Sequence, residues 1–190
     1  MTGDWLAERR TEVAADRILD AADGLFSRHD AATIGMNEIA RAAGCSRATL
    51  YRYFENRDAL YTAYVHRETQ RVFREMGEQI AGIADPRERL TEGIIASLRR
   101  VRDTPALSSW FAETQRPIGG EVAERSEVIR ALTEAFLRSL GADDVERRAR
   151  WLVRVLVSLL LFPDSDERTT LSDFVIPMML PDVDARSAPG

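Results

Sequence analysis

Residues 39–60 of the 190-residue chain read IARAAGCSRATLYRYFENRDAL, and this segment predicts two very short helices joined by a tight turn. The first ends at Gly44, because glycine adopts the left-handed conformation of a helix end at little cost. The second begins after Ser46, whose hydroxyl can accept a free backbone N–H of the first turn. Its buried face consists of Leu50 and Phe54, which are four residues apart and therefore share one side of the helix.

A longer helix from about Glu8 to His29 is expected before this pair, because apolar residues recur there at helical spacing. Three helices in this order form a helix-turn-helix arrangement, in which the second short helix enters the major groove of DNA. Its positions outside the core supply two guanidinium groups for guanine, a hydroxyl with a methyl group, and two phenols suited to phosphate oxygens. We predict that these residues bind DNA: Arg47, Ala48, Thr49, Tyr51, Arg52 and Tyr53.

The charge distribution favours the same segment. The chain carries 26 basic and 31 acidic residues, a formal net charge of −5, so its overall field repels phosphate and DNA binding requires a local basic surface. Between positions 41 and 57 four arginines accompany one acid: Arg41, Arg47, Arg52 and Arg57 against Glu55. Arg57 also lies at the start of the next helix, where the helix dipole and the guanidinium jointly attract a phosphate.

The run from Ile39 to Leu60 resembles the helix-turn-helix signature of the tetracycline-repressor (TetR) family. The resemblance implies an all-helical, cytoplasmic homodimer whose variable C-terminal domain binds a small molecule and releases the DNA. It implies that Ser46 caps the recognition helix and that Arg57 stands where the family usually has a phosphate-binding lysine. It also implies the following DNA contacts: Arg47, Thr49, Tyr51, Arg52 and Tyr53.

One position departs from the family pattern. The first short helix of the family commonly starts with a serine or threonine that binds a phosphate, but here Gly35 offers no hydroxyl. Thr33 lies just outside the helix and could replace it. Asn37 occupies a position that some members use to contact a base, so it is a further DNA-binding candidate.

The remainder of the chain predicts helices and no strand, so the expected fold class is all-α, with a long helix joining the head to a helical bundle. Asp143 and Glu146 have the spacing of a capping box that opens an apolar helix through Leu161, and Pro177 must bend or break the last helix. The other expected helices are 57 to about 85, 87–102, 107–114 and 121–140. The expected domains are a DNA-binding head over 1–55, a ligand-binding and dimerisation body over 56–181, and a disordered tail over 182–190.

Ligand sites in helical bundles are built between facing helices, so apolar residues of the body are candidates for a cavity. These are Met76, Leu90, Ile94, Leu98, Val101, Trp110, Phe111, Phe136 and Trp151. The helix over 150–161 is apolar on nearly every side, which indicates a second buried face. The resemblance implies that this helix and the last one pair with a second copy, through Trp151, Val155, Leu159, Phe162, Phe174 and Met178.

Several classes of function are excluded. No Ser/His/Asp set or glycine-rich phosphate loop is present, so we expect no catalytic residue and no enzyme. Cys45 is the single cysteine, and no Cys/His spacing resembles a zinc site, so we expect neither a disulfide nor a bound metal. The most apolar run, Trp151 to Phe162, is shorter than the roughly 20 residues of a membrane helix. We therefore expect a cytoplasmic protein with no membrane partner.

The sequence thus predicts a sequence-specific transcriptional regulator: a repressor that a small-molecule effector releases from a palindromic operator on double-stranded DNA. The effector is expected to be a small apolar or aromatic molecule, and no other cofactor is expected. Two alternatives remain open, namely a ligand-binding helical protein without a DNA function and a transcriptional activator. Absence of a DNA footprint would favour the first, and a compact body without a cavity would favour a DNA-binding protein without an effector.

Overall fold

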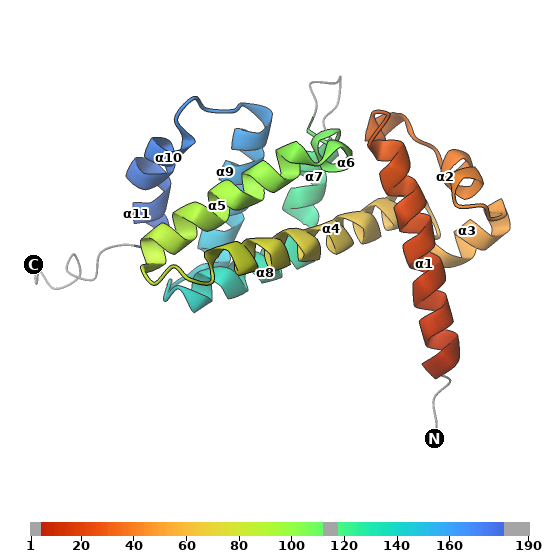
Figure 1. The fold of residues 1–190 in the computed structure, drawn as a ribbon, viewed down its shortest axis with the longest axis horizontal. Coiled ribbons are helices and arrows are strands. Elements are labelled where there is room, and N and C mark those ends of the chain that lie inside the picture. The colour runs from red at the N-terminus through yellow and green to blue at the C-terminus, as the bar shows by residue number, and fades with distance from the viewer. Residues whose placement is uncertain (1–4, 112–117, 181–190) are drawn as a thin grey trace, which may run out of the picture.

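The computed structural model describes residues 5–111 and 118–180, and these ranges contain helices and connecting loops but no strand. The predicted tail over 182–190 and the end of the predicted helix over 107–114 lie outside the described residues. The head contains α1 (Trp5–Phe26), the short turn η1 (Ala31–Thr33), α2 (Met36–Ala42) and α3 (Arg47–Tyr53). The long helix α4 (Arg57–Ile80) leaves the head and runs into the body (Figure 1).

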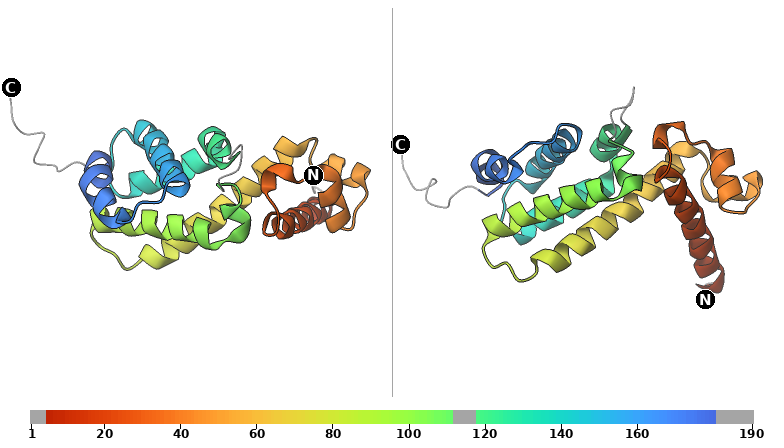
Figure 2. Two further views of the ribbon diagram at one scale, coloured as in Figure 1. Left: turned by 90° about the horizontal axis from the view of Figure 1, so that it is seen from above. Right: turned by 45° about the horizontal axis from the view of Figure 1, so that its top comes forward.

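The body, as we use the term, consists of the second half of α4 and all later helices. These are α5 (Pro86–Asp103), α6 (Pro105–Ser108), α7 (Ile118–Arg125), α8 (Glu127–Ser139), α9 (Val145–Leu161), α10 (Glu167–Thr170), the π-helical turn η2 (Leu171–Val175) and α11 (Ile176–Met179). Helix α5 lies along α4, while α8 and α9 pack against each other and complete the bundle (Figure 2). The head and the body therefore share α4 as a common element.

The two short helices of the head form as local rules require. Gly44 has a φ of +67°, the left-handed conformation that ends α2. The Ser46 hydroxyl accepts the backbone N–H of Thr49 over 3.0 Å and caps α3. Leu50 is fully buried and Phe54 is 7% exposed, so both belong to the head core with Phe26 and Ile39.

An aromatic cluster lies where the head meets the body. Trp110, which follows α6, packs edge-on against Phe26 of α1 at 5.5 Å between ring centroids. It also stacks on Tyr64 of α4 at 5.6 Å, with 11° between the ring planes, and lies 5.0 Å from Tyr61. The core of the head is therefore completed by a residue from the second half of the chain.

Several predictions about helix boundaries are wrong. The short helix expected over 107–114 is α6, which spans Pro105–Ser108 and ends before Ser109. Residues 121–140 form two helices, because the Ser126 hydroxyl accepts the Ile129 N–H over 3.2 Å and starts α8 anew. The predicted capping box is absent, since Asp144 precedes α9 with φ 45° and no side-chain cap, while Asp143 pairs with Arg148. Helix α4 ends at Ile80 rather than near 85, before Gly82, a residue with low helix propensity.

The prediction for the last helix is confirmed. Residues 167–179 are divided into α10, η2 and α11, and Pro177 lies in the first turn of α11, where its missing N–H leaves no bond unmade.

Candidate functional site

Helix α3 lies at the opposite end of the molecule from α10 and α11 (Figure 1). Four of the predicted residues are exposed and two are half-buried, while Leu50 on the opposite side of the helix is buried. The exposed ones are Arg47, Ala48, Tyr51 and Arg52, and the half-buried ones are Thr49 and Tyr53. These six predicted residues therefore all lie on α3, whereas Asn37 lies on α2, Ser46 caps α3 and Arg57 starts α4.

The two arginines of α3 lie against tyrosine rings. The Arg47 guanidinium lies 5.3 Å from the centre of the Tyr51 ring, and the Arg52 guanidinium lies 5.4 Å from that of Tyr53. Such contacts limit the motion of the guanidinium and leave its N–H groups free to donate. A planar group with free, parallel donors can bind a guanine edge or a phosphate bidentately.

The start of α2 differs from the prediction in one respect. Gly35 caps α2, and its N–H donates to the Glu38 carboxylate over 2.9 Å. Thr33, predicted as a substitute for the missing hydroxyl, already donates its hydroxyl hydrogen to the Asp30 carbonyl over 2.8 Å. Asn37 is exposed. The DNA contact of Asn37 remains a prediction.

Arg57 has partners inside the protein. Its guanidinium donates to the carbonyls of Ala31 (3.2 Å) and Ala32 (2.5 Å) and lies 4.8 Å from the centre of the Tyr61 ring. The residue is half-buried. This structural role was not predicted from the sequence: the hydrogen bonds of Arg57 hold η1 against the start of α4. Its predicted phosphate contact remains a prediction.

Two buried tyrosines of α4 complete the contact with the head. The Tyr61 hydroxyl donates to the backbone carbonyls of Ala31 and Ile34, and the Tyr64 hydroxyl donates to the Asp23 carboxylate of α1 over 2.8 Å. Burial raises the pKa of Tyr61 above its ordinary value. Burial, with the Asp23 carboxylate as the next contribution, raises the pKa of Tyr64 strongly. Both phenols therefore stay protonated and continue to donate.

The body contains a cavity of about 150 Å³ between α4, α5, α7, α8 and α9. Four of the nine predicted ligand-pocket residues line it: Leu98, Val101, Trp110 and Phe111. The rest of its wall is mainly apolar and includes Val65, Val72, Phe73, Leu107, Val122, Ile129, Val153, Leu156, Val157 and Leu160.

The other five predicted pocket residues do not line this cavity. Leu90 and Ile94 are buried in the core of the body, and Trp151 packs partly buried against that core. Phe136 lies against Gly93 and Met76, where the three residues fill the space between α4, α5 and α8. These residues face inward as helical periodicity requires, but their side chains meet neighbours rather than a void.

The polar part of the cavity wall was not predicted. Glu68 lines the cavity and is only 3% exposed, and Thr69, Ser97 and Thr133 accompany it. A signal was present in the sequence, because Glu68 interrupts the apolar stripe of α4 one turn after Tyr64 and one turn before Val72. A buried carboxylate at such a position requires a charged partner or a ligand.

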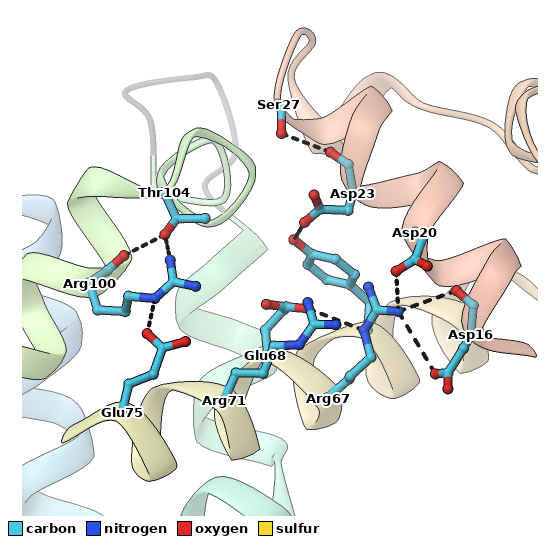
Figure 3. A network of polar contacts seen from close by, with 11 residues as sticks. Asp16, Asp20, Asp23, Ser27, Arg67, Glu68, Arg71, Glu75, Arg100 and Thr104 are labelled. Carbon is cyan, nitrogen blue, oxygen red and sulfur yellow. Dashed lines mark hydrogen bonds and ion pairs between the residues drawn. The ribbon is translucent and has the colours of Figure 1, made fainter. Parts of the chain in front are cut away.

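Arginines supply that partner (Figure 3). The Glu68 Oε1 atom accepts from Arg67 Nε over 3.2 Å and from Arg71 Nη1 over 2.8 Å. Arg67 continues to α1, where its Nη1 donates to the Asp20 carboxylate over 2.8 Å. A polar network thus runs from the cavity wall to the first helix of the head.

Three large apolar side chains of the later helices are exposed to solvent. Phe162 is 73% exposed, Phe174 69% and Met178 56%. Of the other predicted interface residues, Trp151 and Val155 are half-buried, whereas Leu159 is 8% exposed and packs inside the core of its own chain. Leu159 therefore offers little surface to a second copy.

A search of residues 5–111 and 118–180 finds no group of three or more histidine, cysteine or acidic side chains placed to hold a metal ion. In the same ranges no helix has the length and apolar character needed to cross a membrane.

Comparisons with known proteins agree with these features. A family model described as "Bacterial regulatory proteins, tetR family" matches residues 18–64. An uncharacterized HTH-type transcriptional regulator of Mycobacterium tuberculosis (strain CDC 1551 / Oshkosh) is 62% identical over 184 residues, covering 94% of this chain and 91% of that protein.

Two solved structures share the fold. RolR in complex with resorcinol has a TM-score of 0.71 at 16% identity, covering 90% of this chain and 89% of its own. FadR of Thermus thermophilus in complex with lauroyl-CoA has a TM-score of 0.63 at 21% identity, covering 93% of this chain and 99% of its own.

Proposed function

Because this chain belongs to the TetR family of helix-turn-helix transcriptional regulators, we propose that it is a transcriptional repressor. In this proposal it binds a palindromic operator as a homodimer. It leaves the operator when a small molecule fills the cavity. The resemblance inferred from residues 39–60 and the all-α fold class are confirmed. The prediction that the chain is not an enzyme is also confirmed, since its relatives are transcriptional regulators.

The arrangement of α3 is the observation that carries the DNA-binding part of the proposal. Its core residues Leu50 and Phe54 are buried, while Arg47 and Arg52 extend from the other side, each against a tyrosine ring. Guanidinium groups held in this way supply base contacts, and the tyrosine hydroxyls and backbone amides supply phosphate contacts. Because the partner is DNA, the protein acts in the cytoplasm of a bacterial cell.

The exposed apolar side chains of the body support the homodimer. Phe162, Phe174 and Met178 are large apolar side chains left exposed on the single chain, as is expected of residues that an interface between copies covers. A two-fold dimer places two recognition helices in successive major grooves about 34–36 Å apart, which requires a palindromic site. A repressor of this kind blocks transcription by occupying that site.

The cavity and the long helix α4 support release by a ligand. Among proteins of the same fold, RolR was solved with resorcinol and FadR with lauroyl-CoA. Here α4 contributes Glu68 and Val72 to the cavity wall and Tyr61 and Tyr64 to the head core. A ligand that favours a different position of α4 changes the spacing of the two heads. By thermodynamic linkage, DNA then disfavours ligand binding by the same factor.

The experiment that tests this function is recovery of genome fragments by the purified protein, followed by a salt titration on the recovered sequence. We expect one short palindrome, bound with an affinity that falls steeply with salt because phosphate contacts release counterions. Recovery of no specific sequence at low salt by protein with a folded circular dichroism spectrum would refute the proposal.

A further inference from the structure

We propose that the cavity takes a neutral molecule of about one ring that carries a hydroxyl group, with this hydroxyl donating to Glu68 and accepting from the indole N–H of Trp110. This inference specifies the ligand of the proposed function and rests on it in that respect.

The size of the cavity limits the size of the ligand. Its volume is about 150 Å³, and its wall consists mainly of valine, leucine and phenylalanine side chains. A cavity of about this volume with an apolar wall binds benzene in an engineered protein. The space between the helices therefore fits a single ring.

Glu68 favours a ligand with a hydrogen-bond donor. It is 3% exposed, and both arginine hydrogen bonds reach its Oε1 atom. Among the described residues, the hydrogen bonds to this carboxylate all reach Oε1, and Oε2 accepts none from them. A carboxylate oxygen in an otherwise apolar wall favours a ligand that donates a hydrogen bond.

Trp110 favours a ligand with a hydrogen-bond acceptor. It lines the same cavity and is 3% exposed, but its Nε1 atom has no hydrogen-bond partner among the described residues. A buried indole N–H without an acceptor is unfavourable, and buried tryptophans usually find one. A ligand oxygen that accepts from Nε1 removes this cost.

The two polar groups belong to the wall of the same small cavity, Glu68 on α4 and Trp110 after α6. Trp110 stacks on Tyr64 at 5.6 Å between centroids, and Glu68 follows Tyr64 by one helical turn on the same face. A hydroxyl is the smallest group that both donates and accepts, so one such group can serve Glu68 and Trp110 together.

Charge favours a neutral ligand. Arg67 and Arg71 already offset the Glu68 charge, so a ligand needs no charge of its own. Burying an additional charge in an apolar cavity is costly, and a carboxylate ligand would also face Glu68 directly. The proposed class is therefore a phenol or a similar small alcohol.

The test measures binding of phenol, toluene and benzoate to the full-length protein by calorimetry. We expect phenol to bind at least about fivefold more tightly than toluene, and benzoate not to bind detectably. Trp110→Phe keeps the ring and removes the N–H, so phenol should lose about fivefold in affinity while toluene is unaffected. Glu68→Gln should also weaken phenol, whereas Glu75→Gln, a matched change on α4 outside the cavity wall, should not.

Toluene binding as tightly as phenol, or equal losses of both in Trp110→Phe, would overturn the proposal. If none of the three probes binds a folded protein, the ligand class is wrong. Operator binding without any probe is measured in parallel. If no probe binds but the operator is bound, the proposed DNA-binding function stands and only the ligand class is wrong. If the operator is not bound, the DNA-binding function is refuted, whatever the probes do.

Discussion

Arg67 on α4 donates a hydrogen bond to the Asp20 carboxylate on α1 over 2.8 Å, although the two residues lie 47 positions apart in the chain. The same guanidinium lies 3.8 Å from the Asp16 carboxylate and donates through Nε to Glu68 in the cavity wall (Figure 3). Arg67 is therefore the direct polar connection between the cavity and the first helix of the head.

Replacing Asp20 tests this connection. We expect Asp20→Asn to lower the free energy of unfolding by less than about 1 kcal/mol, because its carboxylate is 65% exposed and screened by water. It should, however, reduce the factor by which saturating phenol weakens operator binding. The reason is that α1 loses its ion pair with Arg67 and is no longer coupled to movements of α4 through it. Glu12→Gln, an exposed acid on the same helix, is the control. Identical ligand responses in the two variants would contradict the role of the connection.

The recognition helix gives a prediction about sequence preference. Arg47→Ala and Arg52→Ala should each weaken operator binding by about 1–3 kcal/mol and relax the preference at one base pair, if each arginine contacts a base bidentately. Binding to a set of single-base operator variants measures both effects. Arg99→Ala, which removes an exposed arginine of α5, should leave the pattern unchanged. No loss in either α3 variant would mean that α3 is not the recognition helix.

Arg57 is expected to act on stability first. Arg57→Ala removes the donor to the Ala31 and Ala32 carbonyls and should lower the free energy of unfolding by about 1.5–3 kcal/mol, the range for hydrogen bonds that involve a charged group. Arg57→Lys keeps the charge but cannot reach both carbonyls with a planar fork, so it should recover only part of this loss.

The same two variants separate the structural role of Arg57 from its predicted phosphate contact. If Arg57 also binds a phosphate, the salt slope of operator binding falls by about one in the alanine variant and stays unchanged in the lysine variant. Urea unfolding and salt titration measure the two effects. An alanine variant as stable as the wild type would refute the structural role.

The buried tyrosines predict a loss of stability at high pH. An unfolded tyrosine ionises near pH 10, whereas the pKa values of Tyr61 and Tyr64 are raised in the folded protein. Above pH 10 the unfolded chain therefore binds fewer protons than the folded one, and the free energy of unfolding falls as pH rises. Their contribution is fully present below pH 10. The loss is at most about 1.4 kcal/mol per pH unit for each such tyrosine.

The basic residues make this measurement simple. All 26 are arginines, which remain charged up to about pH 12, so no lysine titrates in the same range. Urea unfolding at several pH values between 10 and 12 measures the slope. Tyr64→Phe should reduce the slope of the free energy of unfolding against pH, because only Tyr61 then contributes to it. A free energy of unfolding that stays constant over this range in the wild type would contradict the prediction.

Residues that obey local rules could be predicted from the sequence. Ser46 and Gly44 fix the ends of two helices through their own side chain or backbone, and α3 forms between them as expected. The candidate DNA-binding surface follows from the same segment, because a helix with Leu50 and Phe54 buried must present its other side to solvent.

Contacts between distant segments could not be predicted. Arg57 meets Ala31 and Ala32 only because η1 folds over the start of α4, and no local pattern indicates this. Leu90 and Leu98 both face inward on α5, but only Leu98 borders the cavity. Periodicity identifies the inward face of a helix, whereas a void depends on how side chains from several helices fit together.

The exposed Phe174 of η2 predicts how the dimer can be broken. Phe174 is 69% exposed, so Phe174→Asp should leave the fold of the single chain intact. In a dimer interface the introduced carboxylate is buried without a partner, which should weaken association by about 2 kcal/mol or more. Sedimentation should then show the mass of one chain, and operator binding should weaken because the two heads are no longer joined. Val13→Asp, at a residue 60% exposed on α1, is the matched control and should remain dimeric. A Phe174→Asp protein that sediments as the wild type does would show that the interface lies elsewhere.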